Sequence, residues 1–98
     1  MGQAIVSPVA LVPGATQVVK AAGPTQYRGI VLRETSASGC VLRIWDSASA
    51  ASGTLLDVVV VAANAAVSNM LPAPVWASNG IVIERVSGTN YEGSVFTG

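Results

Sequence analysis

Apolar residues fall along the chain in short blocks, and clusters of glycine, proline, serine and asparagine separate them. The blocks are rich in valine, isoleucine and leucine and recur about every 8–12 residues, which is the spacing of strands in all-β domains. We expect strands at 15–22, 26–34, 40–46, 54–63, 66–71, 81–86 and 91–97. This pattern predicts one all-β domain, an antiparallel β-sandwich or jelly roll of about seven or eight short strands.

One segment, residues 62–71, competes as a helix because alanine is frequent in it. Asn64, Ser68 and Asn69 interrupt its apolar pattern, and no part of the chain carries a long apolar stripe at about 3.6-residue spacing. The strand interpretation is favoured here, with the helix as the alternative.

The first fourteen residues have a different pattern from the rest. Apolar pieces at 4–6 and 9–12 are interrupted by Pro8 and followed by Pro13 and Gly14. Because proline fixes the backbone and lacks an N–H donor, we expect an edge strand or an arm that reaches a neighbour, and no helix. The prediction is an extended N-terminal arm at residues 1–14 before a β-sandwich domain at residues 15–98.

Alternation within the strands separates a core face from an outer face. In residues 40–46 one face carries only apolar side chains, Cys40, Leu42 and Ile44. The other face is mixed: Val41, Arg43 and Trp45. Residues 58–61 are all valine, which is typical of a strand covered on both sides. A sandwich buries one face of each sheet, so the outer faces are expected to meet another copy or a larger assembly. Scattered exposed apolar residues on a monomer are the alternative.

Composition strengthens this expectation of association. The 98 residues are 51% hydrophobic and 10% charged, with five acidic and five basic side chains. Soluble domains usually carry about 25% charged residues. The chain therefore has more apolar surface than a small domain readily buries.

Several classes of chemistry are excluded or disfavoured by the residues present. The chain has no histidine, which removes the commonest general base and metal ligand. A single cysteine, Cys40, excludes an intrachain disulfide and a zinc site built from cysteine and histidine, and its apolar strand predicts a small buried residue. Zero net charge and dispersed basic residues argue against nucleic-acid binding. The longest strongly apolar run, residues 58–63, is far shorter than the roughly 20 residues of a membrane-spanning helix.

Carboxylates and aromatic residues are the remaining candidates for chemistry. The five acids lie in or at the ends of predicted strands, where pairing with arginine or solvation is their ordinary role: Glu34, Asp46, Asp57, Glu84 and Glu92. We therefore expect no enzyme, no cofactor and no metal. The four large polar aromatics are expected to anchor a core or an interface, with a sugar-stacking platform as the alternative: Tyr27, Trp45, Trp76 and Tyr91.

Residues 23–98 resemble small virion structural proteins of tailed bacteriophages. The similarity is carried by the segments 27–34 and 41–46, by the serine, alanine and glycine loop after them, and by the ending 79–96. It is a pattern of strands and turns that contains no catalytic motif, and it does not include the N-terminal arm.

The resemblance implies a capsid decoration (cement) protein that binds the outer shell and stabilises contacts between major capsid subunits. It implies two partners, further copies of the chain with a trimer favoured and the major capsid protein, and a place on the capsid exterior of the virion after assembly in the host cytoplasm. The alternatives are a tail, fibre or head–tail connector subunit, or a receptor- or glycan-binding module. We expect the arm and the outward faces to carry the contacts, through Ile5, Val6, Val9, Leu11, Val12, Val41, Trp45 and Trp76.

Overall fold

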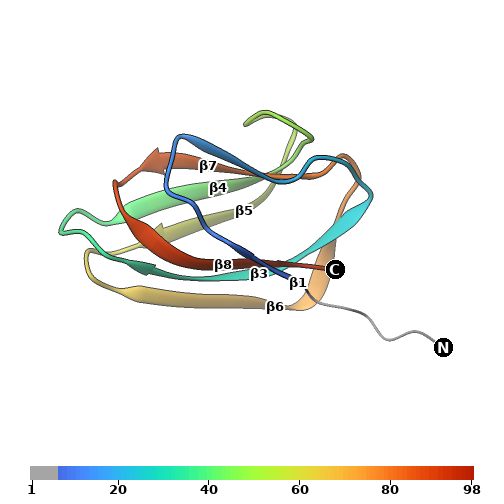
Figure 1. Cartoon of the computed structure of the whole chain (residues 1–98). Coiled ribbons are helices and arrows are strands. Elements are labelled where there is room, and N and C mark those ends of the chain that lie inside the picture. Colours follow the sequence, from blue (N-terminus) through green and yellow to red (C-terminus); the bar gives the residue numbers. More distant parts are fainter. Residues whose placement is uncertain (1–6) are drawn as a thin grey trace.

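Eight strands form the part of the chain that the computed structural model describes, residues 7–98 (Figure 1). Their bounds are β1 Ser7–Ala10, β2 Thr16–Lys20, β3 Thr25–Glu34, β4 Cys40–Asp46, β5 Thr54–Val61, β6 Ala66–Ala77, β7 Ile81–Ser87 and β8 Tyr91–Thr97. Every strand pairing is antiparallel. The all-β prediction is confirmed. In the segment that competed as a helix, residues 62–65 form the turn after β5 and residues 66–71 belong to strand β6.

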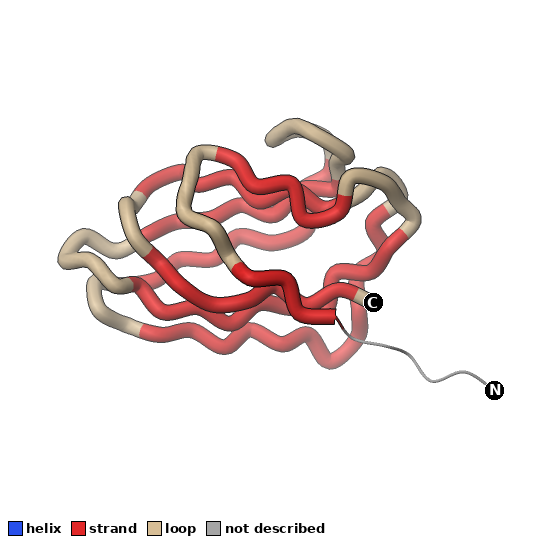
Figure 2. Tube along the Cα trace, in the orientation of Figure 1, coloured by secondary structure: helices blue, strands red, loops and turns tan. Residues whose placement is uncertain are grey.

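The strands form two four-stranded sheets, which we call sheet A (order β1-β8-β3-β6) and sheet B (order β2-β7-β4-β5). Figure 2 shows the two layers, with the loops gathered at their ends. Only the connection from β4 to β5 stays within one sheet, whereas every other connection crosses to the opposite sheet. Eight antiparallel strands connected in this order form a jelly roll.

The core lies between the sheets and follows the alternation of the strands. Sheet A supplies inward side chains from β3 and β8: Tyr27, Ile30, Leu32, Tyr91 and Val95. Sheet B supplies them from β4, β5 and β7: Cys40, Leu42, Ile44, Val59, Val61, Ile81 and Ile83. The predicted core face of residues 40–46 is confirmed, since its three residues are at most 2% exposed.

Strand β6 is longer than the pattern predicts. We expected a strand to end at residue 71, before Pro72, but it continues to Ala77. β6 is the edge of sheet A, where a proline can sit without breaking a ladder on its outer side. The register with β3 shifts between Tyr27 and Gly29, and this irregularity accommodates the proline segment.

The described part of the N-terminal segment packs on its own sandwich. β1 is the edge strand of sheet A and pairs with β8. After it, Leu11 donates its N–H to the carbonyl of Gly93 at 2.9 Å and buries its side chain. The Gln17 amide accepts the N–H of Val12 and donates to the carbonyl of Ala10, both at 2.9 Å. These bonds connect the end of β1 to β2 in the opposite sheet.

Candidate functional site

Several large apolar side chains are exposed on the outer face of sheet B, which we call the sheet B face. Its outward residues include Val18, Val41, Arg43, Trp45, Leu55, Val58, Val60 and Glu84. Val82 also points to this side of the sheet but is fully buried. Four of the apolar ones are strongly exposed, Val60 at 68%, Val18 and Val58 at 46% and Leu55 at 43%. Val18 lies on β2 and the other three lie on β5, the two edge strands of the sheet. Exposed apolar side chains gathered on one face mark a site of association.

Pairing between strands brings these residues side by side. Val82 of β7 lies between Val18 of β2 and Trp45 of β4, which are its partners on the two neighbouring strands. Trp45 in turn lies opposite Leu55. A row of apolar side chains therefore crosses all four strands at one level of the sheet. It is exposed at the edge strands, through Val18 and Leu55, and buried at Val82.

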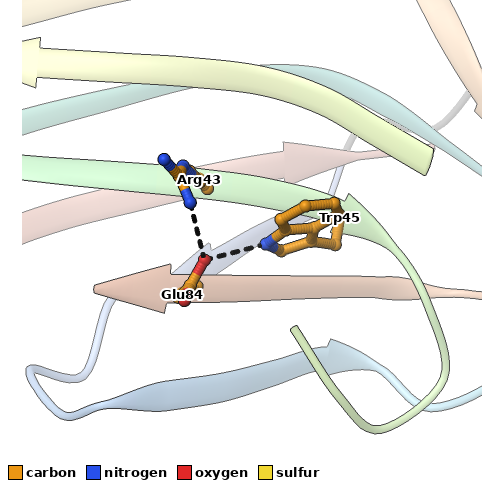
Figure 3. A network of polar contacts seen from close by, with 3 residues as sticks. All are labelled: Arg43, Trp45 and Glu84. Atoms are coloured by element: carbon orange, nitrogen blue, oxygen red, sulfur yellow. Dashed lines mark hydrogen bonds and ion pairs between the residues drawn. The ribbon is translucent and has the colours of Figure 1, made fainter. Parts of the chain in front are cut away.

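Among the outward residues named above, the two charged ones, Arg43 and Glu84, form one network with Trp45 on the central strands β4 and β7 (Figure 3). Glu84 Oε1 accepts the indole N–H of Trp45 at 3.1 Å and lies 3.9 Å from Arg43 Nη1. Both charged side chains are partly solvated, so the ion pair itself contributes little stability. Its effects are to hold the indole in one orientation and to leave the face without net charge.

The predicted interface residues do not all meet on this surface. Val41 and Trp45 lie together on β4, half-buried on the sheet B face. Trp76 is 58% exposed but lies on β6, in sheet A. Val9 packs against the core, Leu11 belongs to it, and Val12 is 61% exposed. Ile5 and Val6 lie outside the described residues.

The strongly exposed residues of the sheet B face were missed as individual contacts. The run of valines at 58–61 signalled an apolar strand on both faces, and the structure buries Val59 and Val61 while it exposes Val58 and Val60. This chain itself covers only one side of that strand. No local signal distinguished the two pairs, because the distinction depends on the register with β4, which places Val59 and Val61 opposite the inward Leu42 and Cys40.

The four large polar aromatics do not share one surface. Tyr27 is fully buried and Tyr91 is 4% exposed, both within the core. Trp45 and Trp76 lie in different sheets. A stacking platform for sugars needs coplanar exposed rings, and this arrangement does not supply one from these four residues.

A polar cluster bridges the two sheets beside strands β5 and β6. Asp57 Oδ2 accepts hydrogen bonds from the Tyr27 hydroxyl at 2.8 Å and from the Asn69 amide at 2.9 Å. Burial raises the pKa of Tyr27, and the hydrogen bond and negative charge of Asp57 raise it further. The tyrosine therefore stays protonated as a donor, and the cluster acts as a tie between sheets.

A second buried polar group lies at the other end of β3. The Glu34 carboxylate accepts the backbone N–H and the hydroxyl of Ser36, and these bonds lower its pKa. Burial, followed by the charge and hydrogen bonding of Glu34, raises the pKa of the nearby Cys40 thiol to about 11. Cys40 is free and buried, as predicted, and its thiol is protonated at neutral pH, unlike a nucleophilic cysteine.

The outer face of sheet A carries a shallow open depression. Its lining comes from β3, β6 and β8 and includes Val31, Arg33, Ser68 and Glu92.

Among residues 7–98, no group of three or more His, Cys, Asp or Glu side chains is placed to hold a metal ion. The same part of the chain has no helix long and apolar enough to cross a membrane.

Comparisons of the chain with protein-family models, with curated proteins and with solved structures give no match. The sheet B face is therefore defined by geometry alone, as an apolar surface with a neutral ion pair at its centre.

Proposed function

We propose that the chain is a structural virion protein of a tailed bacteriophage, a capsid decoration protein that binds the outer shell through the sheet B face. By bridging neighbouring major capsid subunits it stabilises the contacts between them. The observation that carries the proposal is the exposure of Val18, Leu55, Val58 and Val60 on one side of one sheet.

The composition of the face fits a protein partner. The centres of protein interfaces are enriched in aromatic residues and arginine and depleted of unpaired charge. Trp45 and Arg43 lie at the middle of the sheet B face, and Glu84 neutralises the arginine. Such a surface suits a protein partner whose contacting surface is also apolar.

The fold is compatible with this role without specifying it. Jelly rolls occur in viral capsid proteins and also in lectins and enzymes of the cupin type, so the fold alone assigns no function. The phage assignment comes from the resemblance of residues 23–98, and the binding mode comes from the exposed face. The trimeric state that the resemblance implies remains a prediction.

The experiment is a binding assay on DNA-emptied capsids of the encoding phage that lack this protein. Purified chain is expected to co-sediment with these shells and to raise the temperature at which they disassemble. Val18→Lys, which places a charge on the sheet B face, is expected to weaken binding by about tenfold or more. Met70→Lys is the matched control, because Met70 has the same 46% exposure but lies in sheet A. Equal losses for both variants, or no binding by the unmodified chain, would contradict the proposal.

Copy number distinguishes the decoration role from the alternative of a tail, fibre or connector subunit. A decoration protein is expected in an amount comparable to the major capsid protein when purified virions are quantified on a gel. A connector or fibre subunit is present in far fewer copies, so a small fraction of the capsid amount would reassign the protein to those structures.

A further inference from the structure

Three of the four sheet edges carry features that prevent pairing with another chain. β1 has four residues and contains Pro8. β2 has five residues, ends at Lys20 and has a register shift before that lysine. β6 contains Pro72 and Pro74. Short length, proline, lysine and irregular register are the means by which natural proteins protect exposed edges.

The fourth edge, β5, has no such feature along its second half. It is eight residues long and contains no proline, lysine or arginine. From Asp57 to Val61 it pairs with β4 in an unbroken register. Four consecutive valines in a regular edge strand give high β-propensity and present a template for one further strand.

Asp57, the only charged residue of β5, is directed into the molecule. One carboxylate oxygen bonds to Tyr27 and Asn69, and the other accepts the N–H of Val58 at 2.8 Å. The N–H of Val58 is therefore directed away from β4 and is already satisfied within the chain, so it is not a donor to a further strand. Since successive amides of a strand alternate in direction, the N–H of Val60 also faces the open edge.

We infer that β5 pairs antiparallel with β5 of a second copy, about a two-fold axis at Val59. The two four-stranded B sheets then form one continuous sheet across the dimer. In this register Asp57 lies opposite Val61 of the partner subunit, and Val58 lies opposite Val60 of the partner subunit. The two most exposed valines of the strand are thereby paired with each other.

A second copy fits this edge because the edge is complementary to itself. A two-fold interface brings the same surface together from both subunits, so any unpaired charge would meet its own copy. Here Asp57 is bonded inward and stands opposite a valine, while Arg43 beside Val58 is paired with Glu84. Apolar cross-strand pairs along the seam stabilise such a pairing without like-charge repulsion.

The inference is independent of the capsid assignment, and it predicts a dimer where the resemblance implies a trimer. The test measures the mass of the purified chain by sedimentation over a range of concentrations. We expect a dimer for the unmodified chain and, for Val60→Lys, a dissociation constant raised about tenfold or more. Val18→Lys is the control, because it adds the same charge to the sheet B face at the opposite edge and is expected to leave the dimer intact. Circular dichroism establishes that each variant retains its strands.

Backbone hydrogen exchange locates the seam directly. In the unmodified chain the backbone N–H of Val60 is expected to be protected from exchange, because a partner strand covers it. In the Val60→Lys variant the N–H of residue 60 is expected to exchange rapidly. A monomer or trimer, equal effects of the two lysine variants, or a rapidly exchanging Val60 amide in the unmodified protein would overturn the inference. Because Val18→Lys is expected to weaken shell binding and spare the dimer, failure of one proposal is distinguishable from failure of the other.

Discussion

The hydroxyl of Tyr27 in sheet A donates a hydrogen bond to Asp57 in sheet B across 2.8 Å. The two residues are 30 positions apart in the sequence, and the bond ties β3 of sheet A to β5, the edge strand of sheet B. Tyr27 is fully buried, so its hydroxyl has no solvent to replace a lost partner. This contact holds in place the strand that we propose as the dimer seam.

Removing the Tyr27 hydroxyl is expected to destabilise the fold. Tyr27→Phe deletes a hydrogen bond to a carboxylate, and we expect a loss of about 1–3 kcal/mol in the free energy of unfolding, measured with urea. The control is the same substitution in an Asp57→Ala background, where the bond is already absent and the additional loss should be smaller. Equal losses in the two backgrounds would show that the hydroxyl contributes to stability other than through its bond to Asp57.

The Cys40 thiol is expected to resist modification until the solution is strongly alkaline. Its pKa is raised from 9.0 to about 11, first by burial and then by Glu34, so the thiolate is scarce below that range. Because the folded-state pKa is the higher one, the stability that this group contributes is complete below pH 9.0 and is lost as pH rises through about 11. The measurement is the rate of reaction with a disulfide reagent as a function of pH.

The same reagent applied to urea-unfolded protein is the reference for the Cys40 experiment. There the thiol should react with the pH dependence of an ordinary cysteine. A folded protein whose thiol reacts at neutral pH as fast as the unfolded one would contradict the burial and the protonation state of Cys40.

Glu34 is expected to contribute stability that depends on pH in the opposite direction. The hydrogen bonds from Ser36 lower its folded-state pKa below 4.5, so its contribution is present above pH 4.5 and is lost as pH falls below it. Glu34→Gln should therefore reduce the free energy of unfolding more at neutral pH than in acid. Urea unfolding of both proteins at the two conditions checks this, and an equal cost at both would be inconsistent with an ionised, bonded Glu34.

The strands and their inward faces could be predicted from the sequence because their signal is local. Residues 40–46 were expected as a strand and form β4 with the same bounds. Its alternation placed Leu42 and Ile44 in the core, where both are fully buried. The alternation of apolar and polar side chains has a period of two residues, so it can be seen within a single strand. A sheet that buries one face requires this alternation.

The candidate site was less predictable because it depends on strand order. Trp45 and Trp76 were grouped as outward residues, yet they lie in different sheets, since β4 and β6 are separated by a crossover. The outward direction of Val58 and Val60 follows from the register of β5 with β4, which no pattern within a run of four valines encodes. Similarly, the prolines at 72 and 74 signalled the end of a strand, whereas an edge strand tolerates them.

The close packing of β8 on β3 makes one sharp prediction about Gly93. This residue has a φ of +151° and lies opposite Leu32 in β3. A Cβ added here would lie 2.0 Å from the carbonyl oxygen of Val31 and 2.7 Å from the Cα of Leu32. Both are backbone atoms of a paired strand, so they cannot move aside without disturbing the β3–β8 ladder. Gly93 also accepts the N–H of Leu11 through its carbonyl.

Gly93→Ala is therefore expected to lower the free energy of unfolding by about 3 kcal/mol or more, from overpacking together with backbone strain. Gly14→Ala is the matched control, because its Cβ would meet no atom closer than 4.0 Å and should leave stability nearly unchanged. Urea unfolding of both variants beside the unmodified chain gives the comparison. If Gly93→Ala were as stable as Gly14→Ala, the approach of β8 to β3 at this position would have to be looser than the structure has it.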